Sequence, residues 1–259
     1  MSSDELYATP RKISDPSGCH FYHRMEIPGF GPTPWGHWDL RENVDAYLGG
    51  IELAGKRVLE IGPASGFLTF HMESCGAKVV SVELPPDRDW DAVPDASLDI
   101  DAFIKETREN IEHVRDAYWF THERVGSKAK VYYGDIYALP EELGQFDVAV
   151  IASLLLHVRD PLRVVEGCAR LADSLVITDM HYYDMPDDKP YMSWYSVQED
   201  PAPHVWWKFS PQLFVRFAEV LGFTNSTVSF HNQLYVADGP PRPGTMFTVV
   251  STRGASGAG

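Results

Sequence analysis

The stretch that decides the fold is VLEIGPASGFLTF, residues 58–70. It begins as an apolar run that carries the acidic residue Glu60, and it then places Gly62 and Gly66 where a helix would start. Glycine lets the backbone approach a ligand closely, and the first turn of a helix offers free N–H groups. A strand, a glycine-rich turn and a helix therefore predict a nucleotide-binding unit, although similar turns also occur where they only pack.

Short β-branched runs alternate with amphipathic segments around this unit, which predicts βαβ units and a mostly parallel sheet. The expected strands are residues 57–61, 78–82, 129–133, 146–152 and 174–178, and the expected helices are residues 67–74, 100–124, 161–171 and 211–221. Residues 224–231 and 245–251 flank the turn-rich DGPPRPG and are expected to close the sheet as an antiparallel hairpin. The sequence thus predicts an α/β, Rossmann-like sheet of seven strands with helices on both faces.

The domain organisation follows from length. A chain of 259 residues suits one large α/β domain and is short for two. Within this single domain we expect residues 1–54 to form an N-terminal segment and cap. Residues 55–259 are then expected to form the Rossmann-like domain that contains the glycine-rich turn, with an aromatic insertion at residues 180–209.

Charge and composition narrow the class of partner. The formal net charge is −15, and lysine and arginine are scattered, whereas nucleic-acid binders need clustered cations to displace counterions. A small-molecule partner is therefore favoured over nucleic acid. No apolar run approaches the roughly 20 residues of a membrane helix. The polar N-terminus lacks the apolar core of a secretion signal. We expect a soluble, cytoplasmic monomer or homodimer.

The sequence shows no pattern for a required metal. The three cysteines, Cys19, Cys75 and Cys168, are far apart and form neither a paired framework nor a CxxC clip. No HExxH motif and no carboxylate cluster suggests a required metal. We interpret the cysteines as reduced packing residues and expect no metal site.

Three features at the ends of successive predicted strands support a nucleoside ligand. Glu83 closes the second strand, where an acidic side chain can accept hydrogen bonds from both ribose hydroxyls, unless it is a solvated loop carboxylate. Asp135 and Ile136 follow the third strand, where they could bind the adenine amino group and pack on its ring; alternatively Asp135 caps a turn. Residues 152–154 end the fourth strand. Ligands of such sheets bind at this carboxyl edge.

The glycine-rich turn and these three strand-end features follow one another along the chain from about Gly55 to Leu221. In this order they resemble the motifs of the class I S-adenosylmethionine-dependent methyltransferases. The resemblance implies S-adenosylmethionine as cofactor, with the glycine-rich turn at its methionine part, Glu83 at the ribose and Asp135 at the adenine. Ala64 stands where a third glycine is common in the family. The expected cofactor-binding residues are Glu60, Gly62, Ala64, Gly66, Glu83, Asp135, Ile136, Ala152 and Ser153.

A narrower likeness lies partly outside the core. The segments FYHRMEIPGF, WGHWDLREN, VYYGDIYALP, LLLHVRDP and WWKFSPQLFVRFAEVLGF are similar to relatives of the tRNA wobble-uridine (5-carboxymethoxyuridine type) methyltransferase group. One branch of that group transfers a carboxymethyl group and needs a cation beside the added carboxylate. The stretch Trp38 to Gly50 contains Arg41 but no lysine, so ordinary methyl transfer is favoured.

The residues around the methyl acceptor are predicted from position. Methyl transfer is an in-line displacement, so its main need is alignment at about 3 Å, and a base such as His157 is optional. The ring of His157 could instead satisfy a local carbonyl. Residues 180–209 follow the fifth strand, and their many rings suit either a lid over a planar acceptor or simple packing. The expected acceptor-contacting residues are His23, Trp38, His181, Tyr182, Trp206 and Trp207.

The favoured hypothesis is therefore a methyltransferase acting on a small molecule, with an aromatic or planar acceptor as the best match. Two alternatives stay open. The narrower likeness favours an RNA methyltransferase of the tRNA wobble-uridine type. The second alternative hypothesis is a protein that binds S-adenosylmethionine without catalysis, since a fold and a cofactor site do not guarantee chemistry.

Overall fold

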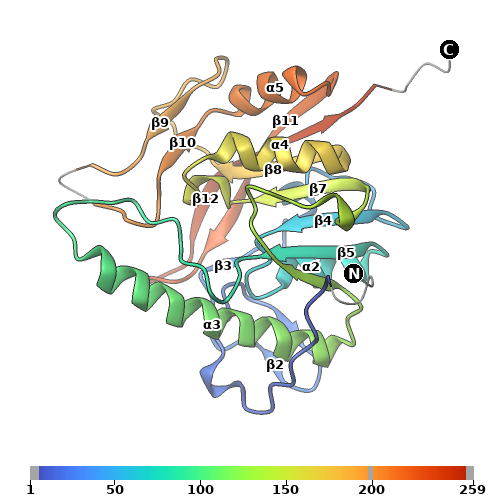
Figure 1. Cartoon of the computed structure of the whole chain (residues 1–259), viewed down its shortest axis with the longest axis vertical. Coiled ribbons are helices and arrows are strands. Elements are labelled where there is room, and N and C mark those ends of the chain that lie inside the picture. The colour runs from blue at the N-terminus through green and yellow to red at the C-terminus, as the bar shows by residue number, and fades with distance from the viewer. Residues whose placement is uncertain (1–5, 198–200, 255–259) are drawn as a thin grey trace.

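The structure, a computed structural model, describes residues 6–197 and 201–254. Its centre is an eight-stranded sheet in the order β3-β11-β12-β8-β7-β4-β5-β6 (Figure 1). The strands are β3 (Trp38–Asp39), β4 (Arg57–Ile61), β5 (Lys78–Glu83), β6 (Lys130–Tyr133), β7 (Phe146–Ala152), β8 (Ala172–Met180), β11 (Asn225–Tyr235) and β12 (Arg242–Thr252).

Strands β4 to β8 pair in parallel, and β12 and β11 close the sheet as an antiparallel hairpin. The predicted α/β, Rossmann-like class is thus confirmed. The sheet has eight strands rather than the predicted seven, because β3 pairs antiparallel with Leu234 and Tyr235 of β11 at one edge. A strand of two residues is too short to show an alternating pattern in the sequence.

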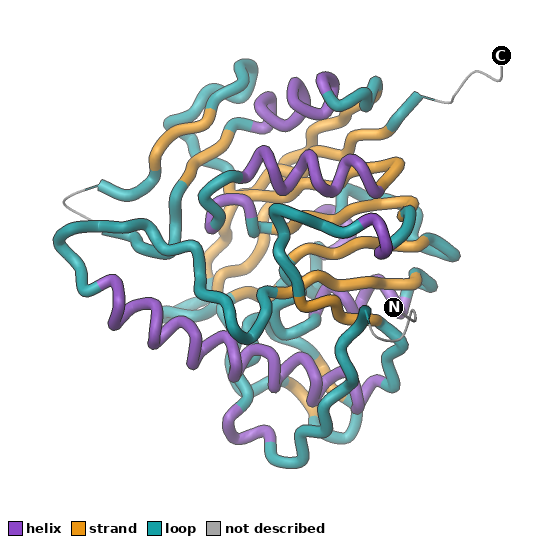
Figure 2. The backbone as a smooth tube through the Cα atoms, viewed as in Figure 1, coloured by secondary structure: helices purple, strands orange, loops and turns teal. Residues whose placement is uncertain are grey.

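Helices cover both faces of the sheet (Figure 2). They are α1 (Val44–Tyr47), α2 (Phe67–Ser74), α3 (Ile100–Val125), α4 (Pro161–Leu171) and α5 (Pro211–Val220), with 3-10 turns η1 (Pro16–Gly18), η2 (Glu141–Leu143) and η3 (Leu155–His157). Alternation along β8 divides the core: Leu175 and Ile177 belong to the cluster under α4 and α5, whereas Val176 belongs to the cluster with α1 and α2.

Two small hairpins lie outside the central sheet. Strands β1 (Glu26–Ile27) and β2 (Gly31–Pro32) form one in the N-terminal segment, and β9 (Met192–Trp194) pairs with β10 (Trp207–Phe209) inside the aromatic insertion. Neither hairpin is predictable from a pattern in the sequence, again because the strands are so short. The N-terminal segment packs Phe21 and Met25 against Phe120 of α3, so it is joined to the domain that it was expected to cap.

Two expectations about composition can be compared with the fold. None of the helices in residues 6–197 and 201–254 is long and apolar enough to cross a membrane. All three cysteines are free, and Cys19 and Cys168 are buried as packing residues should be. Cys75 is exposed, so the interpretation of all three as packing residues is wrong at that position. It follows the end of α2, where the chain turns at the surface toward β5.

Candidate active site

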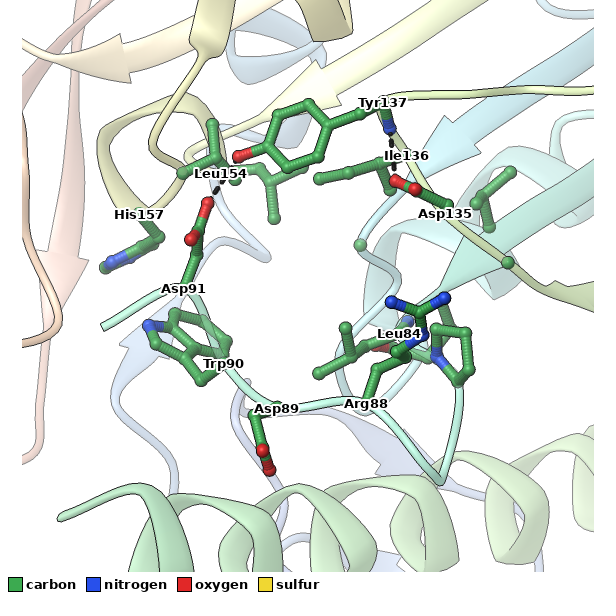
Figure 3. A pocket seen from close by; sticks show the side chains of 16 residues that line it. Leu84, Arg88, Asp89, Trp90, Asp91, Asp135, Ile136, Tyr137, Leu154 and His157 are labelled. Atoms are coloured by element: carbon green, nitrogen blue, oxygen red, sulfur yellow. Dashed lines mark hydrogen bonds between the residues drawn. The ribbon is translucent and has the colours of Figure 1, made fainter. Parts of the chain in front are cut away.

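A cavity of about 210 Å³ lies at the carboxyl ends of β4, β5 and β6, beside the turn that follows β7 (Figure 3). Four residues of the predicted cofactor set line it, namely Gly62, Glu83, Asp135 and Ile136, and the predicted base His157 also forms part of its wall. Residues from three consecutive βα connections therefore meet in one place, as expected at the carboxyl edge of a parallel sheet.

The glycine-rich turn between β4 and α2 adopts left-handed backbone angles at Gly62, Ala64 and Gly66, with φ values of 73°, 48° and 90°. A Cβ on Gly66 would lie 2.3 Å from a ring carbon of Phe70, so only glycine fits there. A Cβ on Gly62 would lie 3.0 Å from a methyl carbon of Leu154, on the cavity side. The turn is therefore shaped so that backbone faces the cavity.

The N-terminal segment is attached to the same turn. The backbone N–H groups of Tyr22 and His23 both donate to the hydroxyl oxygen of Ser65, at 3.0 Å and 3.4 Å. Ser65 is fully buried between Ala64 and Gly66. This contact attaches the N-terminal segment to the glycine-rich turn, and the role of the segment as a cap stays a prediction.

Glu60 lies beneath the turn rather than in the cavity wall. One carboxylate oxygen accepts hydrogen bonds from Thr69 at 2.5 Å and from Ser81 at 2.7 Å, and the other has no partner among the described residues. Burial raises the pKa of Glu60 to about 7, against the opposing effect of these two hydrogen bonds. Its expected contact with the cofactor stays a prediction, since its bonded oxygen fixes α2 to β4 and β5.

Glu83 and Asp135 end neighbouring strands and are held by local backbone bonds. Glu83 accepts the N–H of Leu84 at 2.6 Å, and its backbone carbonyl accepts the N–H of Gly134 at 3.1 Å. Burial raises the pKa of Glu83, and the positive charge of Arg115 opposes this rise. Asp135 accepts the N–H of Tyr137 at 2.8 Å, so it caps its turn while lining the cavity.

The loop after β5 forms a wall that the sequence analysis missed. Asp91 accepts a hydrogen bond from the Tyr137 hydroxyl at 2.5 Å (Figure 3). It also accepts the backbone N–H of Arg159 at 2.7 Å. Trp90 lines the cavity, and its buried indole N–H has no partner within residues 6–197 and 201–254. A clustered DRDWD after a strand is the sequence signal that could have found it.

His157 sits at the far end of the cavity, with its ring centroid 5.4 Å from that of Trp90. Its Nδ1 bonds to the backbone carbonyl of His204 at 2.5 Å. Burial lowers the pKa of His157 to about 4, with a smaller opposing effect from the His204 carbonyl. The geometry matches the alternative interpretation, a ring that satisfies a local carbonyl, and such a low pKa makes the ring a weak proton acceptor at neutral pH.

Ala152 and Ser153 end β7, next along the edge from the cavity. Ser153 has a left-handed φ of 48°, which is uncommon for a residue with a side chain and indicates local constraint. Its hydroxyl lies 2.9 Å from that of Tyr47, which comes from α1 on the N-terminal side. The Tyr47 carbonyl in turn accepts the Thr178 hydroxyl at 2.7 Å.

None of the six predicted acceptor-contacting residues lines the cavity, and they fall into separate groups. His23 and Trp38 pair through an isolated parallel β-bridge of the backbone. The imidazole Nε2 of His181 is hydrogen-bonded to the Asp187 carboxylate at 3.0 Å. The ring centroid of Tyr182 lies 6.0 Å from that of Tyr195. Trp206 and Trp207 attach the insertion to two different loops: their indole N–H groups donate to the carbonyls of Asp91, after β5, and Val158, after β7. The insertion therefore reaches the ligand edge, and its role as a lid stays a prediction.

Comparison with known proteins identifies the family to which this fold belongs. A family model described as a methyltransferase domain matches residues 37–228. The chain belongs to this methyltransferase family. The prediction of a methyltransferase is confirmed at the level of the family, and S-adenosylmethionine is the cofactor expected for that family.

Curated relatives of this methyltransferase include ubiquinone biosynthesis O-methyltransferases. One from Xanthomonas oryzae pv. oryzae (strain PXO99A) is 30% identical over 161 residues, which cover 58% of this chain and 57% of the relative. One from Psychrobacter cryohalolentis is 29% identical over 119 residues, covering 46% and 37%. The chain thus spans 57% of the length of the first relative and 37% of the second, less than two thirds of either.

Two solved structures resemble the fold. The N-terminal domain of EvdMO1, crystallised in the presence of SAH and D-fucose, has a TM-score of 0.52 at 16% identity, covering 82% of this chain and 81% of that one. Magnesium protoporphyrin IX methyltransferase from Synechocystis PCC 6803, with bound SAH, has a TM-score of 0.50 at 13% identity, with the same coverage. At these identities the likeness shows the fold alone.

The residues present at the cavity fit the family's cofactor. Gly62 lines the cavity together with two carboxylates, Glu83 at the end of β5 and Asp135 in the turn after β6. The indole N–H of Trp90 is a further donor without a partner within the described ranges. A nucleoside with ribose hydroxyls and a planar base would supply partners to each of these groups.

Proposed function

We propose that this chain is an S-adenosylmethionine-dependent methyltransferase whose acceptor is a small molecule with an aromatic or planar group. The observation that carries the proposal is the approach of the aromatic insertion to the cofactor-type cavity. The Trp206 indole donates to the backbone carbonyl of Asp91, a residue of the cavity wall. Rings gathered at a ligand edge suit a flat, largely apolar acceptor.

In this proposal the cavity residues hold the nucleoside part of the cofactor. Glu83 accepts hydrogen bonds from the ribose hydroxyls, Asp135 accepts the adenine amino group, and Ile136 packs on the ring. The backbone at Gly62 and Gly66 leaves room for the methionine part. When bound, S-adenosylmethionine supplies a methyl group on a positively charged sulfur. The protein's main task is then to orient the acceptor and exclude water.

The net charge of the chain and the names of its curated relatives both support a small-molecule acceptor. A net charge of −15 with scattered cations opposes binding to a phosphate backbone. The relatives named as O-methyltransferases of ubiquinone biosynthesis support an oxygen acceptor on a small molecule.

The RNA alternative draws only on the narrower likeness to the tRNA wobble-uridine group. In that group's carboxymethyl-transferring branch a free cation is needed, but the Arg41 guanidinium is 2.6 Å from the Asp39 carboxylate. Ordinary methyl transfer therefore remains the favoured chemistry. A non-catalytic binding protein is the second alternative, and it predicts cofactor binding without turnover.

The test measures methyl transfer from isotopically labelled S-adenosylmethionine to two sets of acceptors. One set contains hydroxylated aromatic small molecules, including catechols, and the other contains unmodified tRNA. The proposal expects labelled product in the first set only. Labelled tRNA with no labelled small molecule would establish the RNA alternative. Binding of S-adenosylhomocysteine without transfer to either set would support the non-catalytic one.

A further inference from the structure

The aromatic insertion holds the loop that follows β5 at two points. The Trp206 indole N–H donates to the carbonyl of Asp91, and the N–H of Val93 donates to the carbonyl of Pro203 at 2.9 Å. Trp206 is 115 positions further along the chain than Asp91. Asp91 lines the cavity, whereas neither Trp206 nor Pro203 is among the residues that line it. The insertion therefore supports this wall from outside the cavity.

The insertion also contacts the turn after β7. The backbone N–H of Trp206 donates to the carbonyl of Leu156 at 2.8 Å, and Nδ1 of His157 bonds to the carbonyl of His204 at 2.5 Å. His157 lines the cavity as well. Trp206 thus joins two parts of the cavity wall: its side chain holds the loop after β5, and its backbone holds the turn after β7.

The Trp206 ring itself is fixed by its surroundings. It is buried, and the guanidinium of Arg159 lies 4.9 Å from its ring centre. The same guanidinium is 3.5 Å from the Asp91 carboxylate, which also accepts the backbone N–H of Arg159 at 2.7 Å. A buried indole needs a partner for its N–H, and here that partner is the Asp91 carbonyl. A phenylalanine at position 206 would keep a ring beside Arg159 and lose the bond to Asp91.

The position of Asp91 matters because its neighbour Trp90 forms part of the cavity wall. Figure 3 shows the Trp90 indole beside the cavity. On one side of Trp90, Asp89 bonds at the surface to Arg108 at 3.0 Å. On the other side Asp91 and the buried Val93 are the residues that the insertion holds. A nucleoside in the cavity would therefore meet a ring whose place depends on the insertion.

The affinity for a ligand falls in proportion to the fraction of protein in which the binding wall is in place. We propose that Trp206 is a positioning residue for the cofactor: by holding Asp91, it keeps the Trp90 ring against the nucleoside. The inference rests on the proposed contacts between the cavity and the cofactor. Because coupling between two sites is reciprocal, the bound nucleoside in turn stabilises the insertion. Cofactor binding is thereby linked to the segment that we propose meets the acceptor.

The first experiment measures the affinity for S-adenosylhomocysteine by calorimetry in wild type, Trp206→Phe and Trp194→Phe. Trp194 is the matched control, because its ring centroid lies 5.6 Å from that of Trp206 but it is 47% exposed and does not line the cavity. Trp206→Phe should weaken binding about three- to tenfold, the effect of losing one hydrogen bond. Trp194→Phe should stay within about twofold of wild type.

A double-mutant cycle tests whether Trp206 acts through Trp90. Trp90→Ala alone should weaken the binding of S-adenosylhomocysteine. Adding Trp206→Phe to Trp90→Ala should weaken it by less than about a further twofold, because the ring that Trp206 positions is already gone. A role of Trp206 in general stability alone would lower the affinity by the same factor with and without Trp90, and that result would overturn the inference.

Hydrogen exchange gives a readout that needs no variant. In wild type, saturating S-adenosylhomocysteine should slow exchange of the backbone N–H groups of Val93 and Trp206, which bond to the carbonyls of Pro203 and Leu156. Unchanged exchange at both positions would overturn the inference. So would a Trp206→Phe variant that is folded by urea denaturation and binds like wild type, and this result would leave the proposed function intact. A wild-type protein that does not bind S-adenosylhomocysteine would overturn the proposed function, and the inference with it.

Discussion

The two halves of the ligand edge are built in different ways. The nucleoside half, around Glu83 and Asp135, comes from the ends of adjacent strands and encloses a cavity of about 210 Å³. The half that we propose meets the acceptor gathers Tyr47, Ser153 and the aromatic insertion from distant parts of the chain. Turns that follow neighbouring strands define the first half, whereas side chains from separate segments define the second.

The largest effect we expect concerns the backbone of the nucleoside half. Gly66→Ala should lower the free energy of unfolding by about 3 kcal/mol, because its Cβ would meet the Phe70 ring and its φ of 90° disfavours a side chain. Gly50→Ala is the matched control. Gly50 also has a positive φ, but nothing lies near its Cβ, so its loss should be about 1 kcal/mol. Equal losses in urea denaturation would show that the turn is not tightly packed.

The next effect tests the cofactor contact of that half. Glu83→Ala should weaken the binding of S-adenosylhomocysteine by about tenfold or more, since a hydrogen bond to a charged group contributes about 1.5–3 kcal/mol. The exposed Glu141→Ala in η2 should leave the affinity unchanged. Calorimetry on folded proteins makes the comparison. A Glu83→Ala variant that binds like wild type would remove the ribose role.

Buried carboxylates beside both halves should make stability depend on pH. Burial raises the pKa of Glu60, beneath the glycine-rich turn, and of Asp179, just before the insertion, to about 7 in the folded state. The folded protein therefore holds protons that the unfolded chain has released, so stability is greatest below about pH 4 and declines as the pH rises toward 7. The slope should reach about 1.4 kcal/mol per pH unit for each group.

Single variants divide that slope between the halves. Glu60→Gln should remove one part of the decline and Asp179→Asn another, while Asp173→Asn, at an exposed position on the same strand as Asp179, should remove neither. Urea denaturation at several pH values between 4 and 8 gives the slopes. A decline that is the same in all four proteins would mean that these carboxyl groups do not carry it.

The smallest effect separates the acceptor half from the cofactor. Tyr182→Ala should change the affinity for S-adenosylhomocysteine by less than about twofold, because Tyr182 does not line the cavity. The exposed neighbour Tyr183→Ala is the control. If Tyr182→Ala weakened binding as much as Glu83→Ala, the two halves would not be separable.

Local patterns in the sequence predicted the strands and the glycine-rich turn around the cavity. The runs that became β4, β5 and β7, and the glycine-rich turn between β4 and α2, are local in sequence, so periodicity and turn chemistry were enough. The short strands β3, β9 and β10 have no periodicity to detect. Their pairing depends on partners far along the chain.

The acceptor half shows the limit most clearly. The fifth strand was predicted to end at Thr178, but β8 continues to Met180, where the insertion begins. The Asp91 loop was missed because its position is fixed by Tyr137 and Arg159, and these contacts form only in the folded protein.

A crystal structure with S-adenosylhomocysteine tests the central claim most directly. We predict that its adenosine occupies the cavity between Glu83 and Asp135, against the indole of Trp90, and that its sulfur points toward Ser153. Adenosine bound elsewhere on the molecule, or a sulfur directed away from the end of β7, would contradict the account.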